Sequence, residues 1–101
     1  MSDTDELKDT DQIFMEELKQ EFKERVAVNL KEMSELFRGN NLDEIARIAH
    51  DIKGTSGIFG LDQGTEIAKH LQNAAQNKMV KKTQEFLQQL IDYMRENEII
   101  S

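Results

Sequence analysis

The sequence predicts an all-α protein, an antiparallel up-down-up-down four-helix bundle that forms a single domain over residues 1–101. Apolar residues recur at steps of three and four along most of the 101-residue chain, as on one face of an α-helix. The chain contains no proline, so no residue forbids long helices. Short polar turns separate the periodic stretches, and short turns join antiparallel neighbours.

The first long helix is predicted to begin near Thr10 and Asp11, which are typical N-cap residues. Residues 1–9 are acidic and weakly apolar, and we expect either a tail or a short extra helix there. The inner stripe of the long helix comprises Phe14, Leu18, Phe22, Val26, Leu30, Met33 and Phe37. Gly39 is expected to end this helix in the left-handed conformation.

The second helix is predicted to begin at Asn41, where Glu44 three residues later would complete a capping box. Its inner face comprises Leu42, Ile45, Ile48, Ala49, Ile52, Ser56 and Phe59. Gly60 is expected to stop the helix, and Leu61 would provide the apolar contact of a Schellman ending.

The third helix is predicted to follow Asp62 as its N-cap. Its inner stripe is made of small residues, which favours close approach to a neighbouring helix, and comprises Gly64, Ile67, Ala68, Leu71, Ala74 and Ala75. After a turn at Asn77 and Lys78, the last helix carries Val80, Thr83, Phe86, Leu87, Leu90, Ile91 and Met94. We expect its end to fray near Glu98.

His50 lies on the second helix nearly opposite the centre of its apolar stripe, at about 100° per residue. The imidazole should therefore face solvent. Gly54 and Gly57 share its face, although each interior glycine costs a helix about 0.5–1 kcal/mol relative to alanine. Their missing side chains would let another molecule approach the ring, and Arg47 and Lys53 supply positive charge beside it.

The segment His50-Asp51-Ile52-Lys53-Gly54, followed by Gly57, Gly60 and Leu61, resembles the H-x-x-K-G-x-x-x-x-x-G-L signature of histidine-containing phosphotransfer (HPt) domains. The resemblance implies that His50 accepts a phosphoryl group from the aspartyl phosphate of a receiver domain and passes it reversibly to another receiver. Lys53 would place a positive charge beside His50, and Gly54 would leave the imidazole ring accessible. Members of this family also carry a glutamine that bonds the histidine ring, and Gln72 matches its position.

The same resemblance implies a phosphocarrier rather than an enzyme with its own ATP site. No GxxxxGK[ST] sequence or other nucleotide-binding glycine loop is present, and we expect no cofactor or metal on this chain. Mg²⁺ would come with the receiver partner. If Gln72 accepts from Nδ1–H of His50, Nε2 is the nucleophilic nitrogen. Docking should use the surface around His50, with Ile13 as an exposed apolar contact, and we expect a monomer.

The formal net charge of −7 argues against nucleic-acid binding, which usually needs a basic surface. No apolar run approaches the length of a membrane span, and no secretory signal pattern opens the chain. We therefore expect no membrane partner and a cytoplasmic protein.

Other interpretations stay open from the sequence. A non-catalytic bundle that binds a partner helix is the main alternative, with methionines as adaptable contacts. His50 and His70 could share a metal, although neither forms a Glu-x-x-His pair. The segment 78–82 is basic and is expected to be a solvated turn. The phosphorylatable domain of a chemotaxis-type kinase is disfavoured because no kinase module accompanies it.

Overall fold

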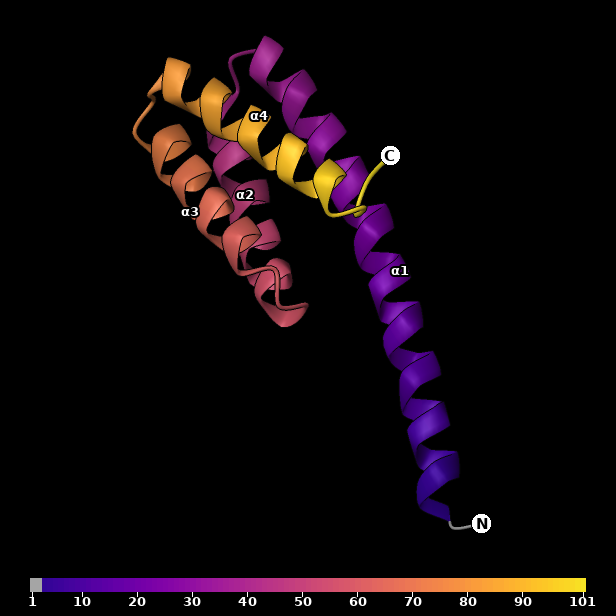
Figure 1. The fold of residues 1–101 in the computed structure, drawn as a ribbon. Coiled ribbons are helices and arrows are strands. Elements are labelled where there is room, and N and C mark those ends of the chain that lie inside the picture. Colours follow the sequence, from indigo (N-terminus) through magenta and orange to yellow (C-terminus); the bar gives the residue numbers. More distant parts are fainter. Residues whose placement is uncertain (1–2) are drawn as a thin grey trace.

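The computed structural model describes the backbone of residues 3–101 and the side chains of residues 11–101. Over these residues the chain forms four helices, namely α1 (Asp3–Arg38), α2 (Leu42–Ile58), α3 (Asp62–Gln76) and α4 (Val80–Glu96). The helices run alternately up and down (Figure 1), each one contacts the next along the chain, and α4 also contacts α1. The predicted antiparallel all-α bundle is confirmed.

Helix α1 is 36 residues long, whereas the other helices have 15 to 17. It begins at Asp3, so residues 3–9 continue the helix and form neither a tail nor a separate element. No glycine or proline interrupts this stretch, and Thr10 and Asp11 therefore lie inside the helix instead of capping it. The first half of α1 extends past the other three helices (Figure 1), which makes the molecule 58 × 21 × 20 Å.

The core lies where the four inner stripes meet. From α1 and α4 it includes Phe22, Val26, Leu30, Met33, Leu87, Leu90 and Met94. From α2 and α3 it includes Leu42, Ile45, Ile48, Ala49, Ile52, Ala68, Leu71 and Ala75. Phe14 and Val80, which were expected on these stripes, are 58% and 48% exposed. They lie toward the starts of their helices, where an apolar stripe continues without a neighbour to cover it.

The helices end in left-handed residues. Asn40, Lys78 and Glu98 have φ of 58° and Gly60 has φ of 71°. In each case the next residue's N–H bonds a carbonyl five residues back, as in Leu61 N–H to Ser56 O at 2.9 Å, which defines a Schellman ending. The ending predicted at Gly60 and Leu61 is confirmed, whereas the left-handed position after α1 is Asn40 and not Gly39.

The predicted side-chain caps are absent. Asn41 occupies the N-cap position of α2 but makes no capping hydrogen bond, and Glu44 bonds Arg47 instead. The N-cap of α3 is Leu61, which makes Asp62 the first helical residue. The turns are so short that one residue both completes the Schellman ending of one helix and occupies the N-cap position of the next, without a capping hydrogen bond from its side chain.

Two further contacts shape the bundle around α4. A Cβ on Gly64 would lie 2.8 Å from Cε2 of Tyr93, so the small stripe of α3 does allow close approach, here by an aromatic ring of α4. Past the end of α4 the chain turns back, and Ile99 is buried against the core rather than frayed. The Ile99 contact is the apolar half of another Schellman ending.

Candidate functional site

His50 lies midway along α2 and is exposed. Ile48, Ala49 and Ile52, which surround it in sequence, are buried in the core. The helix therefore holds the imidazole on its outer face while its inner face is anchored in the bundle. This is the orientation that the hydrophobic periodicity of the sequence predicts.

Gln72 of α3 contacts the ring of His50. Its amide nitrogen Nε2 lies 3.3 Å from Nδ1 of the imidazole. The arrangement considered from the sequence uses the opposite end of the amide, with the carbonyl oxygen accepting from Nδ1–H. A half-turn of the amide exchanges its nitrogen and oxygen in nearly the same positions. In either arrangement Gln72 engages Nδ1, which leaves Nε2 free of this contact.

His50 and Gln72 line an open hollow of about 420 Å³ between α2 and α3, together with Asp43, Ala46, Arg47 and Gln76. Ala46 is itself buried and forms the floor beside the ring. Because the Ala46 side chain is small, it does not block the N-terminal side of the imidazole, and the hollow is open to a docking molecule.

Arg47 lines this hollow but is already paired. Its guanidinium donates to Glu44 Oε2 from Nε at 3.1 Å and from Nη2 at 2.8 Å. The hydrogen bond and the charge of Arg47 lower the pKa of the Glu44 carboxyl, and the same bond raises the pKa of Arg47. An anion at His50 would compete with Glu44 for this arginine.

The two glycines near His50 differ in their surroundings. Apart from the local backbone of α2, a Cβ added to Gly54 would have no atom within 4 Å, and one added to Gly57 would lie 3.9 Å from Oγ1 of Thr65. Packing within this chain therefore requires neither glycine. Close helix–helix approach, which explains Gly64, does not explain Gly54.

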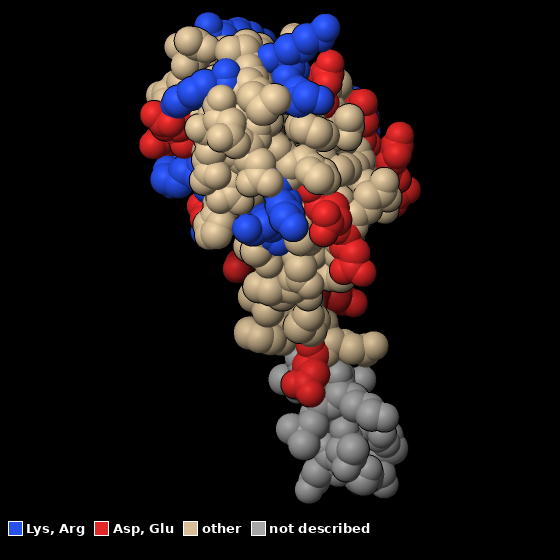
Figure 2. All heavy atoms as spheres, turned by 90° about the vertical axis from the view of Figure 1, so that its left-hand side faces the viewer, with Lys and Arg blue, Asp and Glu red and all other residues tan. Residues whose placement is uncertain are grey.

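On the face shown in Figure 2, basic and acidic side chains are concentrated in different regions. Lys and Arg gather at the end of the bundle that carries the two turns at 39–41 and 77–79, and acidic side chains lie along the edges (Figure 2). At this basic end Lys78 pairs with Asp43 across the α2–α3 groove. Part of the basic segment 78–82 thus ties the turn to α2.

Ile13, the expected apolar docking contact, is 58% exposed, but it lies on the part of α1 that extends past the bundle (Figure 1) and does not line the hollow at His50. Sequence reasoning missed a second apolar surface, a groove between α1 and α2 that includes Leu18, Phe22, Ile58 and Phe59. Ile58 is 73% exposed. Its position off the inner stripe of α2 was the signal available in the sequence.

The second histidine lies apart from the first. The His70 ring stacks on Phe86 of α4 with centroids 5.3 Å apart, and it does not line the hollow at His50. Among residues 11–101 no three His, Cys, Asp or Glu side chains come together as a metal site would require. The structure therefore does not bring the two histidines into one site.

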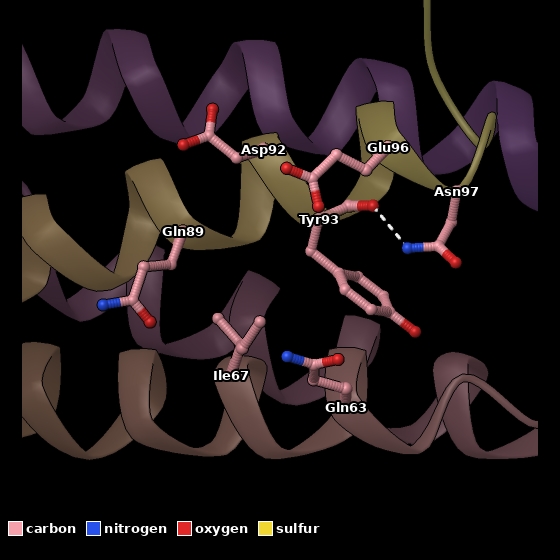
Figure 3. A pocket seen from close by; sticks show the side chains of 7 residues that line it. All are labelled: Gln63, Ile67, Gln89, Asp92, Tyr93, Glu96 and Asn97. Atoms are coloured by element: carbon pink, nitrogen blue, oxygen red, sulfur yellow. Dashed lines mark hydrogen bonds between the residues drawn. The ribbon is translucent and has the colours of Figure 1, made fainter.

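Another hollow lies between α3 and α4 (Figure 3). It is lined by amide and carboxylate side chains with Ile67 and the ring of Tyr93, and Asn97 Nδ2 donates to the Tyr93 carbonyl oxygen at 2.8 Å. No histidine, lysine or arginine is among the described residues that line this hollow. No helix in the described part of the chain has the length and apolar character needed to cross a membrane.

The fold and the site define a helical bundle that presents one histidine on a rigid outer face, next to a glutamine and beside glycines that leave it open. The family model described as Hpt domain matches residues 17–97, and the chain belongs to this family. Hpt domains take part in phosphotransfer in two-component signalling, as phosphocarriers that interact with receiver domains. Comparisons with curated proteins and with solved structures find no match.

Proposed function

We propose that His50 is the phosphoryl acceptor and donor of this Hpt domain. In this proposal it takes the group from an aspartyl phosphate on one receiver domain and passes it to another. The observation that carries the assignment is the exposed imidazole with Gln72 at Nδ1, because this contact directs the opposite nitrogen, Nε2, away from α3. His70 offers no comparable arrangement, since its ring is stacked on Phe86.

The transfer step assigns each electron pair. Nδ1–H of the neutral ring donates to the Gln72 carbonyl after the amide half-turn, so the lone pair is on Nε2. Nε2 attacks phosphorus and forms the N–P bond, while the bond from phosphorus to the aspartyl oxygen breaks and its electron pair leaves with the carboxylate. The reverse reaction returns the phosphoryl group to a carboxylate of a receiver. Histidine is an established nucleophile for such covalent intermediates.

The residues around His50 have supporting roles in this proposal. Lys53 neutralises charge on the phosphoryl oxygens, and Gly54 leaves room for the partner. Gly57 widens the same approach. Arg47 could add a second charge after leaving Glu44. The receiver domain supplies Mg²⁺ and the carboxylates that hold it, so this chain acts as a carrier.

Transfer from labelled receivers tests the assignment. Receiver domains of the source organism, each phosphorylated with labelled acetyl phosphate and Mg²⁺, are mixed with the wild-type chain, His50→Gln and the matched control His70→Gln. At least one receiver should label the wild type and His70→Gln but not His50→Gln. Label retained by His50→Gln, or no transfer from any receiver, would refute the proposal.

A further inference from the structure

Contacts along the α2–α3 groove share one register. Gly57 faces Thr65, His50 faces Gln72, and Ala46 and Gln76 line one hollow. The two residue numbers in each pair add up to the same value, as required for two antiparallel helices of equal rise. The ion pair between Asp43 and Lys78 deviates by one position. The register is thus defined over most of both helices.

The same register places Lys53 of α2 opposite Lys69 of α3. Both lysines lie one helical turn from the His50–Gln72 pair, on the side toward Gly57. Lys69 precedes Gln72 by three positions and therefore shares its face of α3. Figure 2, in which α3 lies on the side facing the viewer, shows basic side chains midway down this face, apart from those at the end of the bundle and with acidic side chains next to them.

Neither lysine takes part in an ion pair among residues 11–101, where the recorded pairs join Arg47 to Glu44 and Lys78 to Asp43. Lys69 is exposed and Lys53 is half-buried. The register thus places two lysines at one level of the groove, one turn from the imidazole, and neither forms an ion pair with a carboxylate among residues 11–101. Like charges on facing turns of two helices repel each other, and an anion bound between them would offset this repulsion.

We propose that Lys69 is a second phosphoryl-binding residue, which acts together with Lys53 on the group carried by His50. This inference rests on the proposed function of His50. A phosphoryl group on nitrogen carries up to two negative charges, and the two ammonium groups from α2 and α3 balance them. The site is then split between two helices, so the phosphorylated state bridges α2 and α3 between the level of the His50–Gln72 contact and the level of Gly57 and Thr65.

A small phosphoryl donor tests Lys69 without the unidentified partner. With phosphoramidate, Nε2 of His50 attacks phosphorus and ammonia leaves. Lys69→Gln should label about 3- to 10-fold more slowly than wild type, the effect expected for loss of one charge-assisted hydrogen bond. Lys69→Arg should restore the rate. Lys81→Gln is the matched control, since it removes the same charge from the exposed start of α4.

A titration of the phosphorylated chain by ³¹P NMR separates binding from general charge effects. The charged side chains on the turns around His50 are Arg47, Asp51 and Lys53 from α2 and Glu66 and Lys69 from α3, while Asp43 lines the hollow and is paired with Lys78. Nearby cations favour the dianion. Lys69→Gln should therefore raise the midpoint of the phosphoryl titration by about 0.5 pH unit, and Lys81→Gln should leave it unchanged.

The two proposals fail in different ways. If Lys69→Gln matches Lys81→Gln in both rate and midpoint while wild type is labelled on His50, the role of Lys69 is refuted and the proposed function stands. If wild type is not labelled on His50, the proposed function itself is refuted. Equal thermal midpoints of unfolding for Lys69→Gln and Lys81→Gln establish that the comparison concerns the site.

Discussion

Gly54 lies one helical turn past His50 on α2, and both residues are exposed. Apart from the local backbone of α2, no atom of this chain lies within 4 Å of where a Cβ would stand, so a larger residue fits within the fold. Glycine in a helix interior lowers stability relative to alanine. The helix thus accepts an energetic cost at a position where packing within the chain does not require glycine.

Replacing Gly54 with leucine should therefore separate function from stability. We expect transfer from a receiver to slow at least tenfold, whereas the unfolding free energy should stay equal or rise by about 0.5 kcal/mol because the interior glycine is lost. Gln84→Leu, at an exposed position of α4, controls for an added apolar side chain. Denaturant unfolding and receiver transfer measure the two effects. Unfolding as the main consequence would favour a packing role for Gly54.

Hydrophobic periodicity was enough to predict the direction of the His50 side chain, but not the side-chain contacts around it. The positions of the buried residues of α2 fix the direction of His50, so its exposure followed from the sequence. The pairing of Arg47 with Glu44 was missed because Glu44 was assigned to the cap of α2. The end of the Gln72 amide that meets Nδ1 could not be predicted, because it depends on which ring nitrogen carries the proton.

The helix ends are defined by backbone geometry more than by capping side chains. The left-handed residues are an asparagine, a glycine, a lysine and a glutamate, and only glycine adopts this conformation without steric cost. The side-chain caps predicted at Asn41 and Asp62 are absent because each turn is shared by two helices. Propensity rules describe a helix end with free flanking residues, which these turns do not provide.

At the end of α4, replacing Glu98 with glycine should stabilise the bundle. Glu98 has φ of 58°, and relief of this strain should raise the unfolding free energy by about 1 kcal/mol. Glu98→Ala is the control, since it removes the same charge from the helix end but keeps the Cβ. Chemical denaturation should give a clearly larger gain for glycine than for alanine. Equal gains would mean that charge, not backbone strain, limits this helix end.

The molecule as a whole consists of a short bundle and a long first helix that extends beyond it (Figure 1). Ile13, Phe14 and Met15 on this extension are all exposed. The match to the Hpt family begins at residue 17, close to where α1 joins the core. The stability of the bundle should thus depend on residues from about Leu18 onward.

Removing residues 1–15 should change the unfolding free energy by less than about 1 kcal/mol, because exposed residues contribute little to stability. Phe22→Ala provides the contrast. Phe22 is 5% exposed and its ring stacks on Phe59 at 4.7 Å, so its truncation should cost about 3–5 kcal/mol. Thermal and denaturant unfolding measure both variants. A large loss in the truncated chain would show that the extension packs on the bundle.

The length of this extension could not be predicted from the sequence, although the bundle could. Phe14 and Leu18 continue the spacing of Phe22 and Val26, and periodicity does not reveal where the neighbouring helices end. Only the packing of α2 and α4 against α1 determines which part of the stripe is covered. The four stripes and the order of the helices, in contrast, are local properties of the sequence, and they were predicted.

The atom that carries the phosphoryl group decides whether His50 is the phosphorylated residue. Two-dimensional ¹H–¹⁵N and ³¹P NMR of the labelled, phosphorylated protein identifies both the histidine and the ring nitrogen that carries phosphorus. We expect a single phosphohistidine at His50 with the N–P bond at Nε2, since Gln72 occupies the Nδ1 side at 3.3 Å. Phosphorus on Nδ1 of His50, or on His70, would contradict it.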